Sequence, residues 1–345
     1  MSHLFKTPFT LSTVVASILV GLIIGALIAR LFSPIATRAN TSAPASNMKV
    51  DVIVKSTDSQ FWQAMLAGSQ TAGNDWGVQV GLFGATSEAD VSNQMSLVEN
   101  SLSRNVNAIV VAASSSQALN GVIARAQKQG IKVITVDTKV TTPSNGFIGT
   151  DNAKAGAQAA DRLGELLQKK GINSGNILIE SSVAGVQTIV DRDRGFQNEL
   201  KARFPNLQIT AHRYNNNDTP VALSQTNDAI SADAKLVGIY ADNNVSGDGV
   251  AQSLQENHAQ NRIVAIGFDS DPQEINALKN GTLQGLMVQN PYFFGYQGVV
   301  TAAMSAQGRF APPSLDPGAV LVDAGNMNTP EVQKLLYPPT TKGRS

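Results

Sequence analysis

The stretch KVDVIVKSTDSQFWQAMLAGSQTAG (residues 49–73) joins a short apolar run to a helical segment through several polar residues. Its Val- and Ile-rich run at 49–54 predicts a buried strand, and residues 61–75 predict an amphipathic helix. Phe61 and Trp62 stand side by side where that helix starts. Neighbouring helix positions point about 100° apart, so we do not expect both rings to face a sheet. We therefore expect this edge to face a ligand.

The succession of a strand and a helix repeats along the chain. Strands that alternate with helices of this length imply crossover units and a parallel sheet buried on both faces. The pattern begins again after residue 151, so the predicted fold class is α/β, with two similar doubly wound parallel-sheet lobes. The strands are expected to start near residues 49, 78, 107, 132, 147, 176, 207, 236, 262, 283 and 319, and the helices to occupy 61–75, 88–104, 117–129, 153–170, 188–204, 220–232, 245–257 and part of 283–308.

Length and charge limit the classes of protein that fit. The 345 residues suffice for two domains at roughly 150 residues per domain. Residues 49–345 hold 23 basic and 26 acidic side chains. This nearly neutral body lacks the basic stripe of a nucleic-acid binder, so we expect no nucleic-acid partner. The chain has no cysteine, which excludes disulfides and thiolate metal sites.

The first 48 residues have the composition of an export segment. Twenty-three uncharged residues separate Lys6 from Arg30, and a bilayer core needs about 20 apolar residues in a helix. Residues 1–48 are therefore expected to form a signal peptide, or an uncleaved signal anchor with its span at 10–32, followed by a linker. The APA at 43–45 is compatible with cleavage, and both alternatives stay open. In either case residues 49–345 are expected in the periplasm.

Polar side chains recur where the predicted strands end. Ligands of open parallel sheets bind outside the carboxyl ends of the strands. Carboxylates accept hydrogen bonds from hydroxyl groups, amides donate and accept, and arginine donates through a planar fork. Aromatic rings cover the apolar faces of a sugar ring. This combination suits a small polyol, and its members here include Ser59, Phe61, Trp62, Asp137, Arg192, Asn243, Asp269 and Gln289.

Each of these residues also has a purely structural interpretation. An aspartate at a strand end could cap the following turn or helix. Arg192 could pair with Asp191 or Asp193 on a solvated helix face, and both aromatic rings could belong to the core. The repetition of such residues at successive strand ends in both lobes favours a ligand site.

Signals of catalysis are missing from the sequence. The three histidines, His3, His212 and His258, lack metal-ligand spacing. The chain contains neither a G-x-S-x-G elbow nor a phosphate-binding G-x-x-x-x-G-K-[ST] loop. GDG at 247–249 follows a predicted strand, but Gln252 breaks the dinucleotide-binding pattern. We expect no enzymatic activity, no metal and no cofactor.

The body of the chain resembles the type I periplasmic binding proteins of the ribose and galactose group, which are the substrate-capturing subunits of ABC sugar importers. The resemblance covers about residues 49–326 and rests on an ordered series of short motifs. Each motif is weak alone, but they follow in the family's order and at nearly its spacing. The series is STDSQFW at 56–62, VITVD at 133–137, IGTDN at 148–152, VDRDRGF at 190–196, YADNN at 240–244, IGFD at 266–269 and VQNP at 288–291.

The resemblance implies an architecture and a set of ligand contacts. An N-terminal lobe would comprise 49–151 and 290–318, a C-terminal lobe 152–289 and 319–333, with three strands crossing at a hinge and a flexible tail at 334–345. Phe61 and Trp62 would sandwich the ring. The remaining contacts would be hydroxyl acceptors at Asp137 and Asp269, donors at Arg192 and Asn243, Ser59 beside the aromatic pair, and Gln289 at a crossing.

Two departures from the ribose-type pattern bear on the ligand. Thr138 stands where ribose binders have an arginine after the strand-end aspartate, and Val190 replaces a second arginine. The missing guanidinium donors argue against ribose itself.

The resemblance implies capture of a monosaccharide or polyol for delivery to an ABC permease, by a monomer. The alternative is a membrane-tethered sensor that passes the ligand state to a kinase or chemoreceptor. A repressor of this fold would need a DNA-reading helix-turn-helix before residue 49, where the segment is instead apolar. Ligand identity depends on geometry that the sequence does not give.

Overall fold

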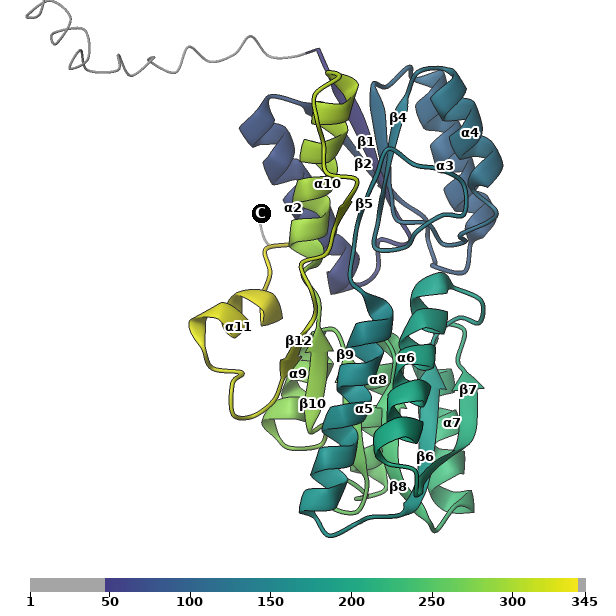
Figure 1. Ribbon diagram of the computed structural model, residues 1–345, viewed down its shortest axis with the longest axis vertical. Helices are drawn as coiled ribbons and strands as arrows, with labels where there is room; N and C mark the ends of the chain where they lie inside the picture. Colours follow the sequence, from purple (N-terminus) through teal and green to yellow (C-terminus); the bar gives the residue numbers. More distant parts are fainter. Residues whose placement is uncertain (1–46, 341–345) are drawn as a thin grey trace, which may run out of the picture. The chain divides into compact units, whose positions relative to one another are not determined.

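The computed structural model describes residues 47–340, which form two α/β lobes (Figure 1). The predicted signal segment, with its span at 10–32, lies outside the described residues. Within residues 47–340, no helix combines the length and the apolar character needed to cross a bilayer. The predicted fold class is confirmed: each lobe contains one six-stranded sheet covered by helices.

The first sheet is parallel throughout, in the order β11-β5-β4-β3-β1-β2. Its central strands are runs of β-branched residues, which suits strands that are covered on both faces. Its strands are β1 (Lys49–Val54), β2 (Gln79–Gly84), β3 (Ala108–Val111), β4 (Lys132–Val136), β5 (Gly146–Ile148) and β11 (Ser314–Leu315).

Alternate residues of these strands pack into two separate apolar clusters. Val52 faces one cluster and its neighbour Ile53 the other, because successive side chains of a strand point to opposite faces. Both are fully buried. Two helices cover each face: α2 (Gln60–Trp76) and α10 (Pro291–Ala306) cover the first, and α3 (Val91–Ser103) and α4 (Asn120–Lys128) the second.

The second sheet repeats this design in the order β12-β10-β9-β8-β6-β7. Only β12 runs antiparallel, to β10. The connection explains this direction. The chain leaves the second sheet after Val288, passes through the other lobe, and returns at Val320 beside the end of β10, so β12 runs back along β10. The strands are β6 (Gly175–Ser181), β7 (Leu207–Tyr214), β8 (Leu236–Ala241), β9 (Val264–Phe268), β10 (Gly285–Val288) and β12 (Val320–Val322).

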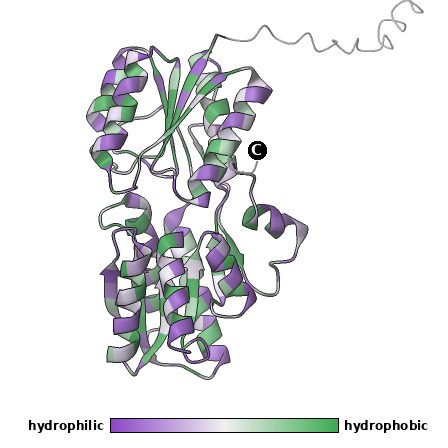
Figure 2. Ribbon diagram, turned by 180° about the vertical axis from the view of Figure 1, so that it is seen from behind, coloured by the Kyte–Doolittle hydropathy of each residue, from purple (hydrophilic) through white to green (hydrophobic). Residues whose placement is uncertain are grey.

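Six helices cover the second sheet. α5 and α6 share one apolar cluster with it, and the other four helices share the opposite cluster. Figure 2 shows helices with both hydrophobic and hydrophilic residues, as expected for helices that bury a single face. Their bounds are α5 (Asn152–Lys169), α6 (Gln187–Arg203), α7 (Thr219–Ala232), α8 (Asn244–Glu256), α9 (Pro272–Lys279) and α11 (Pro330–Leu336).

The described chain passes between the two sheets three times: from β5 to α5, from β10 to α10, and from β11 to β12 (Figure 1). The lobe bounds given above stay a prediction, since all described residues fall within one compact unit. Three short elements were not predicted, namely β11, α9 and α11. The last of these occupies residues 334–336 of the predicted tail.

Candidate ligand-binding site

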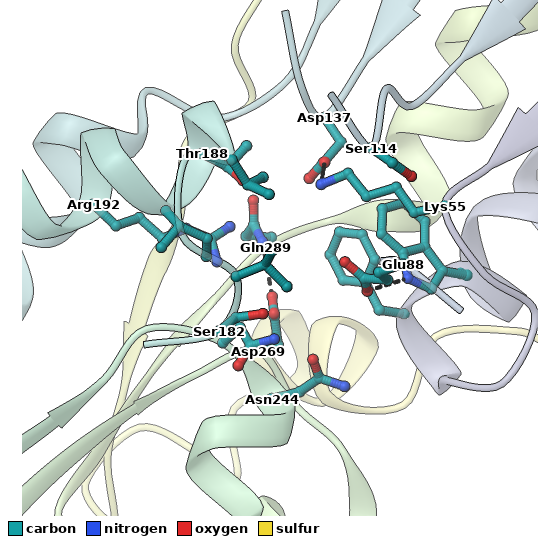
Figure 3. A pocket seen from close by; sticks show the side chains of 16 residues that line it. Lys55, Glu88, Ser114, Asp137, Ser182, Thr188, Arg192, Asn244, Asp269 and Gln289 are labelled. Carbon is teal, nitrogen blue, oxygen red and sulfur yellow. Dashed lines mark hydrogen bonds and ion pairs between the residues drawn. The ribbon is translucent and has the colours of Figure 1, made fainter. Parts of the chain in front are cut away.

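A cleft lies where the carboxyl ends of the two sheets meet, and both lobes line it (Figure 3). We call it the interlobe cleft. Its volume is about 490 Å³, including space open to solvent. The first lobe contributes Lys55, Phe61, Trp62, Glu88, Ser114 and Asp137, the second Ser182, Val183, Val186, Thr188, Ile189, Arg192, Asn243, Asn244 and Asp269, and Gln289 lies at a crossing.

Two aspartates enter the cleft by the same backbone device, one from each lobe. Asp137 follows β4 with φ 59°, and Asp269 follows β9 with φ 81°. Few residues other than glycine adopt this left-handed conformation, and aspartate tolerates it better than most. Each amide still donates to the neighbouring strand, Asp137 to the Ile148 carbonyl at 2.9 Å and Asp269 to the Met287 carbonyl at 2.8 Å. The chain thus turns each carboxylate toward the cleft without losing a sheet hydrogen bond.

Asp137 is held by a buried ion pair. Lys55 Nζ lies 2.9 Å from Asp137 Oδ2, and both side chains are about 5% exposed. Thr138 Oγ1 donates to the same oxygen at 2.7 Å. Because Lys55 directly follows β1, the ends of two strands of one sheet supply the pair.

Phe61 and Trp62 both line the cleft, and both are buried in the first-lobe core. Both rings therefore belong to the apolar cluster of the first sheet as well as to the cleft wall. They stand at the first turn of α2, where Phe61 packs edge-on against Phe294 of α10 with ring centroids 6.5 Å apart. Trp62 instead turns toward the loop after β2 and donates through Nε1 to Glu88 Oε1 at 2.7 Å. Desolvation raises the pKa of the Glu88 carboxyl.

Arg192 is almost fully buried, at 3% exposure, on α6. Its guanidinium lies over the Phe268 ring, with Cζ 3.6 Å from the centroid. Nε donates to Asn152 Oδ1 at 2.8 Å, and Nη1 to the Asp242 carbonyl at 2.7 Å. These contacts, and not the alternative ion pair with Asp191 or Asp193, hold the Arg192 side chain in place. A stacked guanidinium with two of its five donors engaged is a rigid donor at the cleft wall.

A chain of hydrogen bonds links the second aspartate to a crossing. Gln289 Nε2 donates to Asp269 Oδ1 at 2.8 Å, and Gln289 Oε1 accepts from Thr150 Oγ1 at 2.8 Å. Thr150 lies at the β5-to-α5 crossing and Gln289 at the β10-to-α10 crossing. Burial raises the pKa of Asp269 to about 7, although the Arg192 charge and the Gln289 hydrogen bond oppose the shift.

Asn243 is both a helix cap and a cleft residue. Its Oδ1 accepts from the Ser246 amide at 2.9 Å, which caps α8, while its Nδ2 donates to Asn217 Oδ1 at 2.8 Å. Ser59 is the one predicted site residue that does not line the cleft. It is the N-cap residue of α2, half-buried. The other seven predicted residues come together in the cleft, and their role in binding stays a prediction.

More than half of the lining residues were not predicted from the sequence. Lys55, Ser114 and Ser182 each lie one to three residues beyond a strand end, so the strand-end rule could have found them. Glu88 lies four residues after β2, in a loop whose path the sequence does not reveal. The apolar members come from the N-terminal part of α6 and the loop before it and carry no sequence signal. In the part of the chain that the structure describes, no group of His, Cys, Asp and Glu is arranged to hold a metal.

The geometry defines a two-lobed protein with a polar and aromatic cleft between its lobes, and sequence comparison agrees. Residues 50–310 match the periplasmic binding protein domain family, and the chain belongs to that family.

Three known proteins illustrate the similarity. The D-allose-binding periplasmic protein of Escherichia coli K12 is 26% identical over 282 residues, covering 79% of this chain and 89% of that protein. A carbohydrate transporter solute-binding protein from Agrobacterium radiobacter, solved with D-arabinose, has a TM-score of 0.82 and 34% identity, covering 85% of this chain and 99% of that one. An ABC transporter solute-binding protein from Agrobacterium vitis, solved with D-fucose, has a TM-score of 0.80 and 31% identity, with 84% and 100% covered.

Proposed function

We propose that this protein is the solute-binding subunit of an ABC importer and that it captures a small carbohydrate or polyol in the interlobe cleft. The observation that carries the proposal is the meeting of Asp137 and Asp269, one from each lobe, in a cleft that also contains Arg192 and two aromatic rings. The relatives described above are sugar-binding or sugar-transport proteins, and this chain matches each of them over most of its length. No catalytic role is proposed.

Each side chain has a role in this scheme. Asp137 and Asp269 accept hydrogen bonds from hydroxyl groups, while Arg192 and Asn243 donate to hydroxyl or ring oxygens. The rings of Phe61 and Trp62 cover the C–H faces of the sugar and exclude water. Such a set binds a compact ring with several hydroxyl groups more tightly than one with fewer, because a missing hydroxyl leaves a buried polar group of the protein without its partner.

Capture is coupled to closure of the lobes. A ligand that touches both lobes binds the closed form more tightly than the open form and shifts the population toward it. The closed form is then the one that an ABC permease recognises. The relatives named above carry sugar-binding and transporter names, which favours an importer subunit over the sensory alternative.

The proposal includes export to the periplasm through residues 1–48, as a cleaved signal peptide or an uncleaved anchor. N-terminal sequencing of the exported protein separates the two. A start near residue 40 or 46 supports a released subunit, whereas an intact Met1 supports a tethered one.

A thermal-shift screen tests the function. The panel contains pentoses, hexoses, polyols, amino-acid-like compounds, nucleotides and peptides. A monosaccharide or polyol at a hundredfold excess over its Kd is expected to stabilise the protein by about 2.7 kcal/mol. A screen in which only nucleotides or peptides raise the melting temperature contradicts the proposal.

Two variants connect the response to the cleft. Asp137→Ala and Asp269→Ala are each expected to weaken binding of the responding monosaccharide at least tenfold in calorimetric titration. Asp228→Ala, at an exposed position on α7, is the matched control and should bind as the unmodified protein does. Equal binding in all three variants contradicts the assigned site.

A further inference from the structure

A second cavity opens beside the interlobe cleft and shares two residues with it. This cavity, which we call the side chamber, has a volume of about 820 Å³, including space open to solvent. Asp137 and Thr188 line both spaces. In Figure 3 these two side chains lie on the same side of the cleft, away from Asn244. These two residues therefore stand where the two spaces adjoin, and a group attached to a ring in the cleft would have to pass them to reach the side chamber.

Resting on the proposed function, we infer that the site accepts neutral glycosides, with one sugar ring in the interlobe cleft and the attached unit in the side chamber. Both lobes build the chamber, so an occupant would contact both, as a ligand of the cleft itself does. Besides the two shared residues, its walls include Lys139, Phe147 and Ser314 from the first lobe and Ala153, Gln187 and Arg194 from the second.

The charges of the side chamber favour a neutral occupant. Four of its lining residues are aspartates and only two are cationic. Both cations are engaged: Arg194 Nη2 lies 2.6 Å from Asp191 Oδ1, and Lys139 Nζ lies 4.7 Å from the centroid of the Phe147 ring. Asp137 and Asp191 are paired with Lys55 and Arg194, so the charges that remain are those of Asp151 and Asp316 against Lys139. A phosphate or uronate group would therefore meet a net negative wall, whereas hydroxyl groups would find carboxylate acceptors.

The remaining wall suits a second sugar or an aryl group. Phe147 is half-buried and offers an apolar surface, while Thr150, Gln187 and Ser314 offer polar atoms around it. Aromatic surface with a few polar groups is the usual recognition surface for a ring that has both apolar faces and polar edges.

Calorimetric titration with matched pairs tests the inference. The probes are free D-allose, D-fucose and D-arabinose, the methyl and phenyl glycosides of each in both anomeric forms, and the corresponding 1-phosphates. At least one neutral glycoside is expected to bind within tenfold of its parent sugar, and the 1-phosphate of that sugar at least tenfold more weakly than the glycoside.

Two variants fill the side chamber from opposite lobes at positions that do not line the interlobe cleft. Ala153→Trp and Ser314→Trp are each expected to weaken glycoside binding at least tenfold and parent-sugar binding less than twofold. Either variant serves if the other fails to fold. Gln158→Trp, at an exposed position on α5 that lines neither space, is the matched control and should bind both probes normally.

The outcomes separate this inference from the function on which it rests. If a free sugar binds and none of its glycosides binds within a hundredfold, the side chamber is only a solvent-filled opening and the inference is overturned. The same holds if both tryptophan variants leave glycoside binding unchanged. If no free monosaccharide or polyol binds at all, the proposed function fails and this inference with it.

Discussion

At the scale of single residues, the unusual feature is a buried ion pair at the wall of the cleft. Lys55 and Asp137 are each about 5% exposed, and their charged atoms lie 2.9 Å apart. Burying two charges costs several kcal/mol per ion, which their attraction and further hydrogen bonds must offset. Thr138 supplies one such hydrogen bond. The pair therefore depends on both partners being present.

We expect Asp137→Asn to destabilise the ligand-free protein by about 3 kcal/mol, because it leaves the Lys55 ammonium buried without its counter-charge. The double variant Lys55→Met/Asp137→Asn should recover most of that loss. Urea denaturation of the single and double variants measures both effects. A single variant as stable as the parent protein would mean that Lys55 reaches water, against the observed burial.

The raised pKa of Asp269, about 7, predicts a pH dependence of binding. The ionised carboxylate accepts more hydrogen bonds than the protonated acid, so a bound polyol favours the ionised form. Affinity for the responding monosaccharide should be constant above about pH 8 and fall below about pH 7, by up to about tenfold per pH unit. Titrations from acidic to mildly alkaline pH measure it.

Two variants assign this pH dependence. In Asp269→Asn the fall in affinity at low pH should disappear along with most of the affinity. Glu88 also lines the cleft with a raised pKa. If the pH dependence of binding remains in Asp269→Asn and disappears in Glu88→Gln, the titrating group is Glu88 and not Asp269.

At the scale of elements, each lobe holds one closely packed helix pair that ends at the cleft. In the first lobe, a Cβ at Gly295 of α10 would lie 1.9 Å from the Met65 carbonyl oxygen of α2. In the second, a Cβ at Gly195 of α6 would lie 1.9 Å from the Ala153 carbonyl oxygen of α5. Neither helix pair can therefore accept a larger residue at its glycine. The packing places the start of α2, with its aromatic rings, and α6, with Arg192, at the cleft.

Gly195→Ala should destabilise the protein by about 3 kcal/mol, because the new methyl group forces α5 and α6 apart. Monosaccharide binding should weaken too, since Arg192 lies one turn earlier on α6 and is bonded to Asn152 of α5. Thermal unfolding and titration measure the two effects. Gly121→Ala on α4, where a Cβ approaches only the Arg125 side chain at 3.8 Å, is the control and should be neutral or slightly stabilising.

At the scale of the described body, residues 47–340, the C-terminal segment adds a connection beyond the three crossings. Val332 and Leu336 of α11 are buried in the second-lobe core. Beyond the helix, Lys279 Nζ donates to the Tyr337 hydroxyl at 2.9 Å. Pro338 then shares a small cavity with Phe61 of the first lobe and with residues of the second. The segment thus packs on the second lobe and ends beside the first lobe, next to the cleft.

A chain that ends at Thr329 should lose about 3 kcal/mol of unfolding free energy, since the burial of Val332 and Leu336 is lost. Urea denaturation compares it with a chain that ends at Thr340 and keeps α11. The latter should unfold like the full chain. Equal stability of all three chains would show that α11 contributes nothing to the second-lobe core.

Elements whose signal is local could be predicted from the sequence. Strands such as β1 and β7 and the long helices were predicted within a few residues, because the periodic spacing of their apolar residues is a property of neighbouring sequence positions. The short elements β11, α9 and α11 were missed, since two to eight residues carry too little periodicity. The α/β class and the strand-end location of site residues such as Asp137 and Asp269 also followed, because parallel sheets place their carboxyl ends on one edge.

The tertiary structure alone decided which of these residues contact one another, how deeply they are buried and how their pKa values shift. Lys55 and Asp137 are far apart in the sequence and pair because β1 and β4 both end at the cleft. The position of both rings of α2, the stacking of Arg192 on Phe268, the raised pKa of Asp269 and the side chamber all depend on contacts between distant segments. Burial and charge at a site are sums over neighbours in space, and a linear sequence specifies those neighbours only through the complete fold.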